Sequence, residues 1–170
     1  MFRALESPKF KNKISCIKGQ EIYIDNVKCE ILRIANPEIT YSDNGNDSSM
    51  VFKMTATDVN KSILFLGDAY IYTSKELMEN PEKLKADVVQ LAHHGQNGVT
   101  KEVYEAIHPE VAVFNCHEGL YNNDFGGGYN TGIWKTIEVR EWMDSMGAKK
   151  IVSYEGDQTI RFTENGIEIE

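Results

Sequence analysis

Cysteine is scarce in this sequence, with only Cys16, Cys29 and Cys116 among 170 residues. Their odd number and the lack of a Cys-x-x-Cys spacing argue against a disulfide framework and a zinc knuckle. Cys16 and Cys29 stand in strand-like segments, where we expect them to act as small buried apolar side chains. We therefore expect a cytoplasmic protein.

Long apolar runs and excess positive charge are also missing. A helix that spans a bilayer needs about 20 consecutive apolar residues, and no segment of the chain approaches this length. The first eight residues lack the apolar run of a signal peptide. A formal net charge of -8 argues against a broad surface that follows phosphates. We predict neither a membrane segment nor a strong nucleic-acid patch.

The composition that remains is typical of a globular protein, with 41% hydrophobic and 26% charged residues. We expect an irregular lead-in over residues 1–11 and one domain over 12–170. Apolar and β-branched patterns predict strands over 13–18, 21–25, 27–35, 50–54, 62–66, 86–92, 111–114, 151–154, 159–163 and 167–169. Predicted helices cover 73–80, 100–107 and 131–146. Strands alternate with helices in the second half, which favours a mixed α/β (α+β) fold.

Two details of this pattern carry specific expectations. Thr73-Ser74-Lys75-Glu76 has the capping-box pattern, which places a helix start at Thr73. Residues 117–130 form a glycine- and asparagine-rich loop that is either a rim able to close over substrate or a plain surface loop. The acidic segment from Glu155 to the C-terminus predicts a solvated hairpin face.

Asp68 follows directly after the apolar run 62–66 and Gly67. A carboxylate at the end of such a strand faces the crevice at the sheet edge, where open α/β sheets bind ligands. Glycine at position 67 lets the backbone or a ligand approach closely. Taken alone, a Gly-Asp pair is more often a turn or a helix cap than part of a site.

His93-His94-Gly95 likewise ends an apolar strand. Adjacent side chains leave a strand in opposite directions, so one histidine can bind a metal while the other faces substrate or solvent. Imidazole and carboxylate groups from neighbouring strand ends suit zinc, manganese or iron. For the pair alone, one core histidine beside one exposed histidine is an equal alternative. Because Asp68 occupies an equivalent position, we favour the metal site.

Three segments in this order, 46–51, 64–69 and 86–96, resemble the metallo-β-lactamase superfamily. Their sequences are Asn-Asp-Ser-Ser-Met-Val, Leu-Phe-Leu-Gly-Asp-Ala and Ala-Asp-Val-Val-Gln-Leu-Ala-His-His-Gly-Gln. The branch they look most like is the soluble domain of DNA-uptake competence proteins and related bacterial phosphodiesterases. The resemblance covers about residues 20–163. It implies the C-terminal αβ layer of an αββα sandwich, a mixed sheet flanked by helices.

By this resemblance, Asp68 bridges two metal ions, zinc or else manganese or iron, and His94 binds the second of them. His93 would be a catalytic neighbour that contacts substrate or transfers a proton. A metal-bound water would attack a phosphodiester or ester bond. Four further residues would support the site: Asn46, Ser49, Gly67 and Gly95.

The sequence departs from the family at its first metal. The early His-x-His-x-Asp-His motif is absent, and the chain holds only His93, His94, His108 and His117. A His-Pro pair near residues 129–131 is absent as well. A catalytic zinc normally takes three protein ligands and a water. We therefore expect a fragment of a hydrolase that binds metal weakly and is inactive without an N-terminal half.

Two alternatives stay open. A non-catalytic interaction module would expose the sheet face that packs on its twin, and would pair with itself or a partner through it. An ordinary α/β protein, in which the motifs are coincidental, is the third hypothesis. Cys116-His117 could line the same rim as the histidine pair, although a structural or surface role is favoured.

Overall fold

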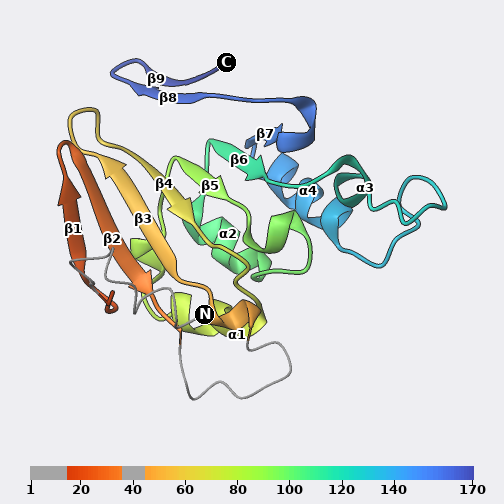
Figure 1. The fold of residues 1–170 in the computed structure, drawn as a ribbon, viewed down its shortest axis with the longest axis horizontal. Coiled ribbons are helices and arrows are strands. Elements are labelled where there is room, and N and C mark those ends of the chain that lie inside the picture. Colours follow the sequence, from red (N-terminus) through yellow and green to blue (C-terminus); the bar gives the residue numbers. More distant parts are fainter. Residues whose placement is uncertain (1–14, 36–44) are drawn as a thin grey trace, which may run out of the picture.

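The computed structural model describes residues 15–35 and 45–170, and its centre is a seven-stranded mixed sheet with strand order β1 to β7 (Figure 1). The first four strands form an antiparallel meander: β1 (Glu21–Ile24), β2 (Val27–Arg33), β3 (Val51–Ala56) and β4 (Lys61–Phe65). Three strands then follow β4 in parallel: β5 (Val88–Gln90), β6 (Val111–Phe114) and β7 (Lys149–Val152). The prediction of a mixed α/β fold is confirmed, and the parallel half brings the ends of β4, β5 and β6 to one edge.

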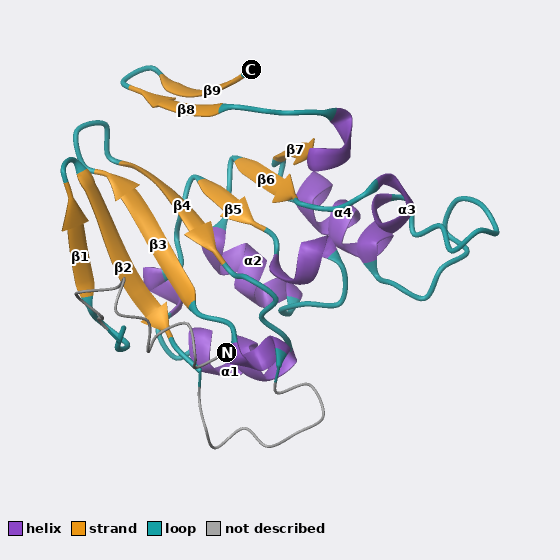
Figure 2. Cartoon of the chain, in the orientation of Figure 1, coloured by secondary structure: helices purple, strands orange, loops and turns teal. Residues whose placement is uncertain are grey.

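The helices gather on one side of this sheet (Figure 2). They are α1 (Ile71–Leu77), α2 (Lys101–Ile107), α3 (Glu118–Tyr121) and α4 (Thr136–Ser145). Four 3-10 turns complete the described elements: Asn46–Ser48, Pro81–Lys83, Ala92–Gly95 and Ser153–Glu155. No helix in the described part of the chain has the length and apolar character needed to cross a membrane.

The main core lies between the helices and the sheet. Leu64 and Leu66 of the β4 segment, both fully buried, join Val103 and Tyr104 of α2 and Met143 of α4 in one cluster. Because side chains alternate along a strand, the neighbouring residues Ile63 and Phe65 face the other side. The helix side of the sheet is therefore closed by the chain itself.

The opposite face is covered in part by a C-terminal hairpin, β8 (Ile160–Thr163) and β9 (Gly166–Ile169), which pair only with each other. Apolar residues of the hairpin pack against residues of β4 to β7 in a second cluster: Ile63, Val88, Val111, Val113, Ile151, Ile160, Phe162, Ile167 and Ile169. The acidic side chains of this segment are exposed, as expected of a solvated hairpin face, while alternation turns the apolar side of each strand toward the sheet.

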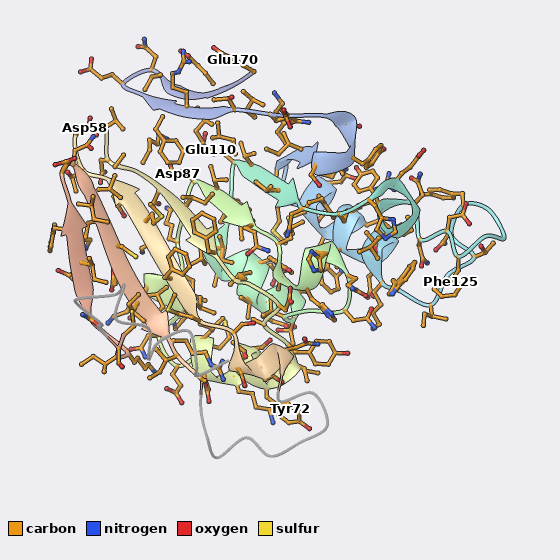
Figure 3. The ribbon with its side chains drawn as sticks, viewed as in Figure 1. Asp58, Tyr72, Asp87, Glu110, Phe125 and Glu170 are labelled. Atoms are coloured by element: carbon orange, nitrogen blue, oxygen red, sulfur yellow. The ribbon has the colours of Figure 1, made fainter. Side chains whose placement is uncertain are left out.

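An ionic cluster lies at the other end of the parallel strands from Asp68. Lys61 Nζ lies 2.9 Å from Asp87 Oδ1 and 3.1 Å from Glu110 Oε1. The Ser62 backbone N–H also donates to Asp87 Oδ2 at 2.7 Å. Figure 3 labels Asp87 and Glu110 beside each other at this end. The cluster joins the starts of β4, β5 and β6.

Helix α1 begins at Ile71, two residues before the predicted capping box at Thr73. Its cap comes from another segment, because Asp47 Oδ1 accepts hydrogen bonds from the N–H groups of Tyr70 and Thr73 and from the Thr73 hydroxyl. A capping contact across 23 to 26 residues leaves no local sequence pattern.

Helix α4 begins at Thr136, five residues after the predicted start at 131. The preceding residues are held in turns by Asn123, which is buried and whose Oδ1 accepts the Trp134 N–H at 3.0 Å. The predicted loop 117–130 contains the short helix α3 at its start. Asp124 Oδ1 accepts hydrogen bonds from the N–H groups of Gly126 and Gly128, so a polar side chain of this segment holds its own backbone in place.

Strand boundaries differ from the predictions mainly at strand ends. The predicted strand 86–92 is limited to Val88–Gln90, because the chain turns at Ala92. The final parallel strand covers Lys149–Val152 rather than 151–154, and a 3-10 turn follows it. Of the predicted strand 13–18 and the lead-in 1–11, only residues 15–18 lie within the described residues, and these are not in a strand.

Candidate functional site

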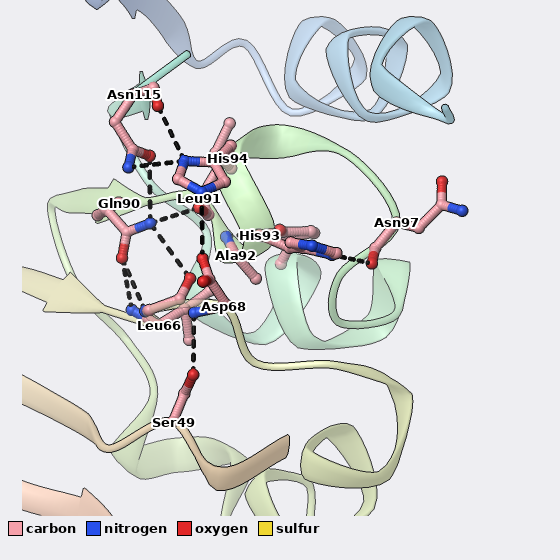
Figure 4. Close-up of polar contacts among 12 residues, drawn as sticks. Ser49, Leu66, Asp68, Gln90, Leu91, Ala92, His93, His94, Asn97 and Asn115 are labelled. Carbon is pink, nitrogen blue, oxygen red and sulfur yellow. Dashed lines mark hydrogen bonds and ion pairs between the residues drawn. The ribbon is translucent and has the colours of Figure 1, made fainter. Parts of the chain in front are cut away.

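Asp68 and His94 meet at the carboxyl ends of β4 and β5 (Figure 4). Asp68 Oδ1 lies 3.5 Å from His94 Nε2, and the two side chains are 46% and 42% exposed. They are separated by 26 positions in the sequence, and parallel pairing of β4 with β5 brings them together. The pair therefore faces solvent at the edge of the sheet.

The ring of His94 is oriented by Asn115, which follows β6. His94 Nδ1 lies 3.0 Å from the Asn115 backbone oxygen and 3.2 Å from the Asn115 side-chain Nδ2. The carbonyl contact is the shorter, and a carbonyl can only accept, so it favours a proton on Nδ1. The lone pair is then on Nε2, the atom that faces Asp68.

This arrangement suits a cation between the two side chains. Two ligand atoms bound to one tetrahedral zinc at about 2.0–2.1 Å lie roughly 3.3 Å apart. The separation of 3.5 Å between Asp68 Oδ1 and His94 Nε2 is close to this value. A histidine whose second nitrogen donates to a backbone carbonyl is also the usual form of a metal ligand.

The turn that carries Asp68 is fixed by Ser49, which lies between the 3-10 turn Asn46–Ser48 and β3. The Ser49 hydroxyl accepts the Asp68 backbone N–H at 3.0 Å. Gly67 has a φ of +59°, and a side chain there would place its Cβ 3.1 Å from Ser49 Cβ. Left-handed backbone and close approach both favour glycine at this position. Ser49 and Gly67 thus shape the turn.

Gln90 joins three strand ends behind the site, and sequence reasoning did not identify it. Its Oε1 accepts the N–H groups of Leu66 and Gly67 at 3.1 and 2.8 Å. Its Nε2 donates to Asn115 Oδ1 at 3.3 Å. The sequence feature that could have indicated Gln90 is its position as the one polar side chain within the apolar run 88–92. Gln90 and Asn115 together connect both candidate ligands.

The histidine pair lies in a turn rather than in a strand. His93 and His94 have φ values of +50° and +62°, followed by Gly95 at +82°. The Tyr104 hydroxyl accepts the Ala92 N–H at 3.2 Å and anchors the start of the turn. The His93 N–H donates to the Gly67 carbonyl at 2.9 Å, so the two turns of the site are tied together.

His93 has different partners from His94. Its Nδ1 lies 2.9 Å from the Asn97 carbonyl, and its ring meets Tyr70 edge-on at 5.8 Å between ring centroids. The carbonyl contact favours a proton on Nδ1 and leaves the lone pair on Nε2. A hollow of about 390 Å³ is lined by Tyr70 and Asn97, together with Lys101, Lys135 and Trp142. Each histidine thus belongs to a different side of the site.

Gly95 permits the close packing of this turn on the sheet. A Cβ at Gly95 would lie 2.4 Å from Cδ1 of the buried Phe114 ring. Among the other predicted supporting residues, Asn46 begins the 3-10 turn before Ser49, and its carbonyl accepts the Ser49 N–H at 3.0 Å. Sequence reasoning missed its neighbour Asp47, the cap of α1.

Cys116 and His117 follow β6 near His94. Burial raises the pKa of the Cys116 thiol to about 11, so the thiol stays protonated near neutral pH and is a poor nucleophile. His117 Nδ1 accepts the Leu120 N–H at 3.2 Å at the start of α3. His108 is exposed and lies at the end of α2, away from the candidate ligands.

Within residues 15–35 and 45–170, no group of three or more histidine, cysteine, aspartate or glutamate side chains is arranged to hold a metal ion. Asp68 and His94 therefore stand as a pair of candidate ligands. No protein-family model matches the sequence, and no curated protein matches it either.

Proposed function

We propose that this chain supplies part of the centre of a metal-dependent hydrolase, acting on phosphodiester or ester bonds. The observation that carries the proposal is the contact between Asp68 Oδ1 and His94 Nε2 at 3.5 Å, with the His94 ring turned by Asn115. Two acceptor atoms that face each other at this distance repel unless a cation or a proton lies between them. A divalent metal is the cation that this donor pair selects.

Asp68 and His94 would hold the metal, which we expect to be zinc or else manganese or iron. When bound, such an ion supplies a water of lowered pKa that can attack a phosphoryl or acyl centre near neutral pH. The contact of His94 Nδ1 with the Asn115 carbonyl favours a lone pair on Nε2, and Ser49 holds the Asp68 turn. The residues present thus fit one side of a metal site.

His93 would act on the substrate side. Its Nδ1 is engaged by the Asn97 carbonyl, which leaves Nε2 to accept a proton or, when protonated, to donate one to an oxygen of the substrate. Left-handed backbone at two successive histidines costs roughly 1–3 kcal/mol each, and such strain clusters at functional sites. This strain supports a role for the turn beyond packing.

A catalytic zinc requires three protein ligands, so the site needs ligands from beyond the described residues. In the metallo-β-lactamase resemblance they come from a second αβ layer that faces the first. The hairpin β8–β9 lies over β4 to β7 like the beginning of such a layer. We propose that this second layer, in the same or another polypeptide, carries the histidines that complete the centre.

Zinc binding tests the assignment directly. We expect the protein alone to bind Zn²⁺ weakly in competition with a chromophoric chelator. Asp68→Ala and His94→Ala should each lower the affinity by about tenfold or more, because half of the donor pair is lost. His108→Ala, which removes an exposed histidine elsewhere, is the matched control. Equal loss in the control, or unchanged binding in both site variants, would contradict the assignment.

Activity provides the second measurement. The substrate is bis(4-nitrophenyl) phosphate, and the partner is a polypeptide that carries a His-x-His-x-Asp-His layer. Hydrolysis should depend on both components, on the metal and on Asp68. A complex that binds zinc but does not hydrolyse phosphoesters or carboxylic esters would refute the hydrolase and leave the metal site in place.

The second candidate function is a non-catalytic interaction module. The observation in its favour is the sheet face beyond the hairpin, where the register places Ile22, Cys29 and Met54 in one apolar row. Ile24 on the same face of β1 is 63% exposed. Light scattering of the wild type and of Met54→Glu measures the association. A stable monomer in both would count against this function.

A further inference from the structure

A hollow of about 610 Å³ lies beside His94, on the side away from His93's contacts. Its lining comes from the ends of β5, β6 and β7: His94, Asn115, Cys116, His117, Leu120, Ser153 and Tyr154. Hollows of about 300–1,000 Å³ are typical of sites for small molecules. Because His94 is shared, a molecule in this hollow would lie next to the candidate metal ligands.

His117 offers a hydrogen-bond donor to this hollow. Its Nδ1 accepts the Leu120 backbone N–H, so the neutral ring carries its proton on Nε2. No hydrogen bond occupies this Nε2 within the part of the chain that the structure describes. The short helix α3 therefore fixes the tautomer of His117 and leaves a donor for a ligand.

Tyr154 offers an aromatic surface and a hydroxyl on another side of the hollow. The residue is 38% exposed, and its ring packs on Tyr121 with 5.6 Å between ring centroids. Among the described residues its hydroxyl has no hydrogen-bond partner. Leu120 and the protonated thiol of Cys116 supply the apolar part of the lining. Ser153 Oγ is already used, since it donates to the Cys116 carbonyl at 3.0 Å.

We propose that this hollow binds the aromatic heterocycle of a small phosphoester substrate, of the size of one nucleotide, whose phosphoryl group lies at Asp68 and His94. This inference rests on the proposed function for the position of the phosphoryl group. The heterocycle packs on the Tyr154 ring and accepts hydrogen bonds from His117 Nε2 and the Tyr154 hydroxyl.

The charge of the protein favours a single nucleotide over a polymer. The formal net charge is -8, and the hollow itself is lined by no lysine or arginine. Affinity for a nucleic-acid strand comes largely from lysine and arginine contacts to successive phosphates. With no basic side chain in this lining, aromatic packing and two donors must provide the recognition.

The test compares two probes that differ only in the base, 5′-AMP and ribose 5-phosphate. Their binding to the full chain is followed by NMR, without metal and then with Zn²⁺. We expect 5′-AMP to bind at least about tenfold more tightly, because packing of one base on an aromatic side chain has an effect of that order. The shifted resonances should be those of Leu120, Tyr154 and their neighbours.

Three variants separate the contributions of the lining. Tyr154→Phe removes the hydroxyl alone and should lower the affinity for 5′-AMP several-fold. Tyr154→Leu removes the aromatic ring as well and should lower this affinity about tenfold. His117→Asn keeps an acceptor for the Leu120 N–H and removes the Nε2 donor. Lys149→Gln, an exposed substitution elsewhere, is the control.

Equal binding of the two probes, or 5′-AMP affinity unchanged by all three variants, would overturn the proposal. Tighter binding of a single-stranded oligonucleotide than of 5′-AMP would overturn the choice of a small substrate. The outcome is separate from zinc binding. The protein can prefer 5′-AMP to ribose 5-phosphate through Tyr154 and His117 even if Asp68→Ala leaves the zinc affinity unchanged. That combination would retain the subsite and refute the metal centre.

Discussion

The two faces of the seven-stranded sheet differ in how fully the described chain covers them. On the helix side, Leu64 of β4 is fully buried in the main core. On the other side, its neighbour Phe65 is half-buried and stacks on Phe52 with 4.8 Å between ring centroids. The first face holds the main core, and the second face is covered in part by the hairpin β8–β9. The candidate ligands lie at the edge that both faces share.

The largest effect is expected from substitutions at two adjacent positions of β4, one on each face of the sheet. Leu64→Ala should lower the free energy of unfolding by about 3 kcal/mol, because it leaves a cavity in a closed core. Phe65→Ala should cost about 1 kcal/mol, since part of its ring is already exposed. Urea denaturation of the two variants measures the contrast. Equal losses would show that both faces are closed.

The next effect concerns the histidine turn. Gly95→Ala should destabilise the protein by about 2 kcal/mol, since the new Cβ meets the buried Phe114 ring and the backbone has a φ of +82°. Gly126→Ala is the matched control, because its φ of +96° lies in open space and only the backbone cost of about 1 kcal/mol applies. Thermal unfolding measures both. A Gly95 variant as stable as the control would mean that the turn is not packed on Phe114.

A smaller effect is expected at the hairpin. Phe162→Ser should release β8 and β9 from the open face at a cost of about 1 kcal/mol, because its ring packs against the second cluster. The freed segment should become sensitive to protease and the sheet should bind a hydrophobic dye. Arg161→Ser changes the exposed side of the same strand and should leave both readouts unchanged. Identical behaviour of the two variants would argue against a hairpin that covers the sheet.

The smallest effect depends on pH. Burial alone would raise the pKa of Asp87, but hydrogen bonds from Lys61 and Ser62 outweigh it and hold the pKa below its usual value. Asp87 therefore stabilises the fold above its unfolded pKa of about 3.9, and this contribution is lost as pH falls through the lower folded pKa. Asp87→Asn should cost about 1 kcal/mol at neutral pH.

Unfolding measured from pH 7 to pH 2 checks the sign of this effect. The difference between wild type and Asp87→Asn should shrink on acidification, because the wild-type carboxylate becomes protonated. Glu110→Gln removes the exposed partner of Lys61 and should change stability by less than about 0.5 kcal/mol. A constant difference across the pH range would exclude Asp87 as the source.

Much of the fold could be predicted from local pattern. The strands β2 to β6 follow from apolar and β-branched runs, and the positions of Asp68 and the histidine pair at strand ends were visible in the sequence. Parallel pairing of β4 with β5 then brings Asp68 and His94 to 3.5 Å. Their role as metal ligands stays a prediction, as does the resemblance to the metallo-β-lactamase superfamily.

The supporting contacts could not be predicted, because their partners are distant in the chain. Asp47 caps α1 from a separate turn, and Asn123 delays the start of α4. Gln90 looked like an interruption of an apolar strand, yet it joins the ends of β4, β5 and β6. Contacts between residues that are distant in the chain produce no regular spacing in a single sequence, so they cannot be recognised from it.

The sequence by itself determined where strands end and which reactive side chains stand there, since alternation and turn residues act over a few positions. Only the tertiary structure decided which of these side chains meet and how they are oriented. It turned His94 toward Asp68 through Asn115, and His93 toward Asn97 and Tyr70. The physical reason is that ring orientation depends on hydrogen bonds to backbone groups that the fold brings from other strands and turns.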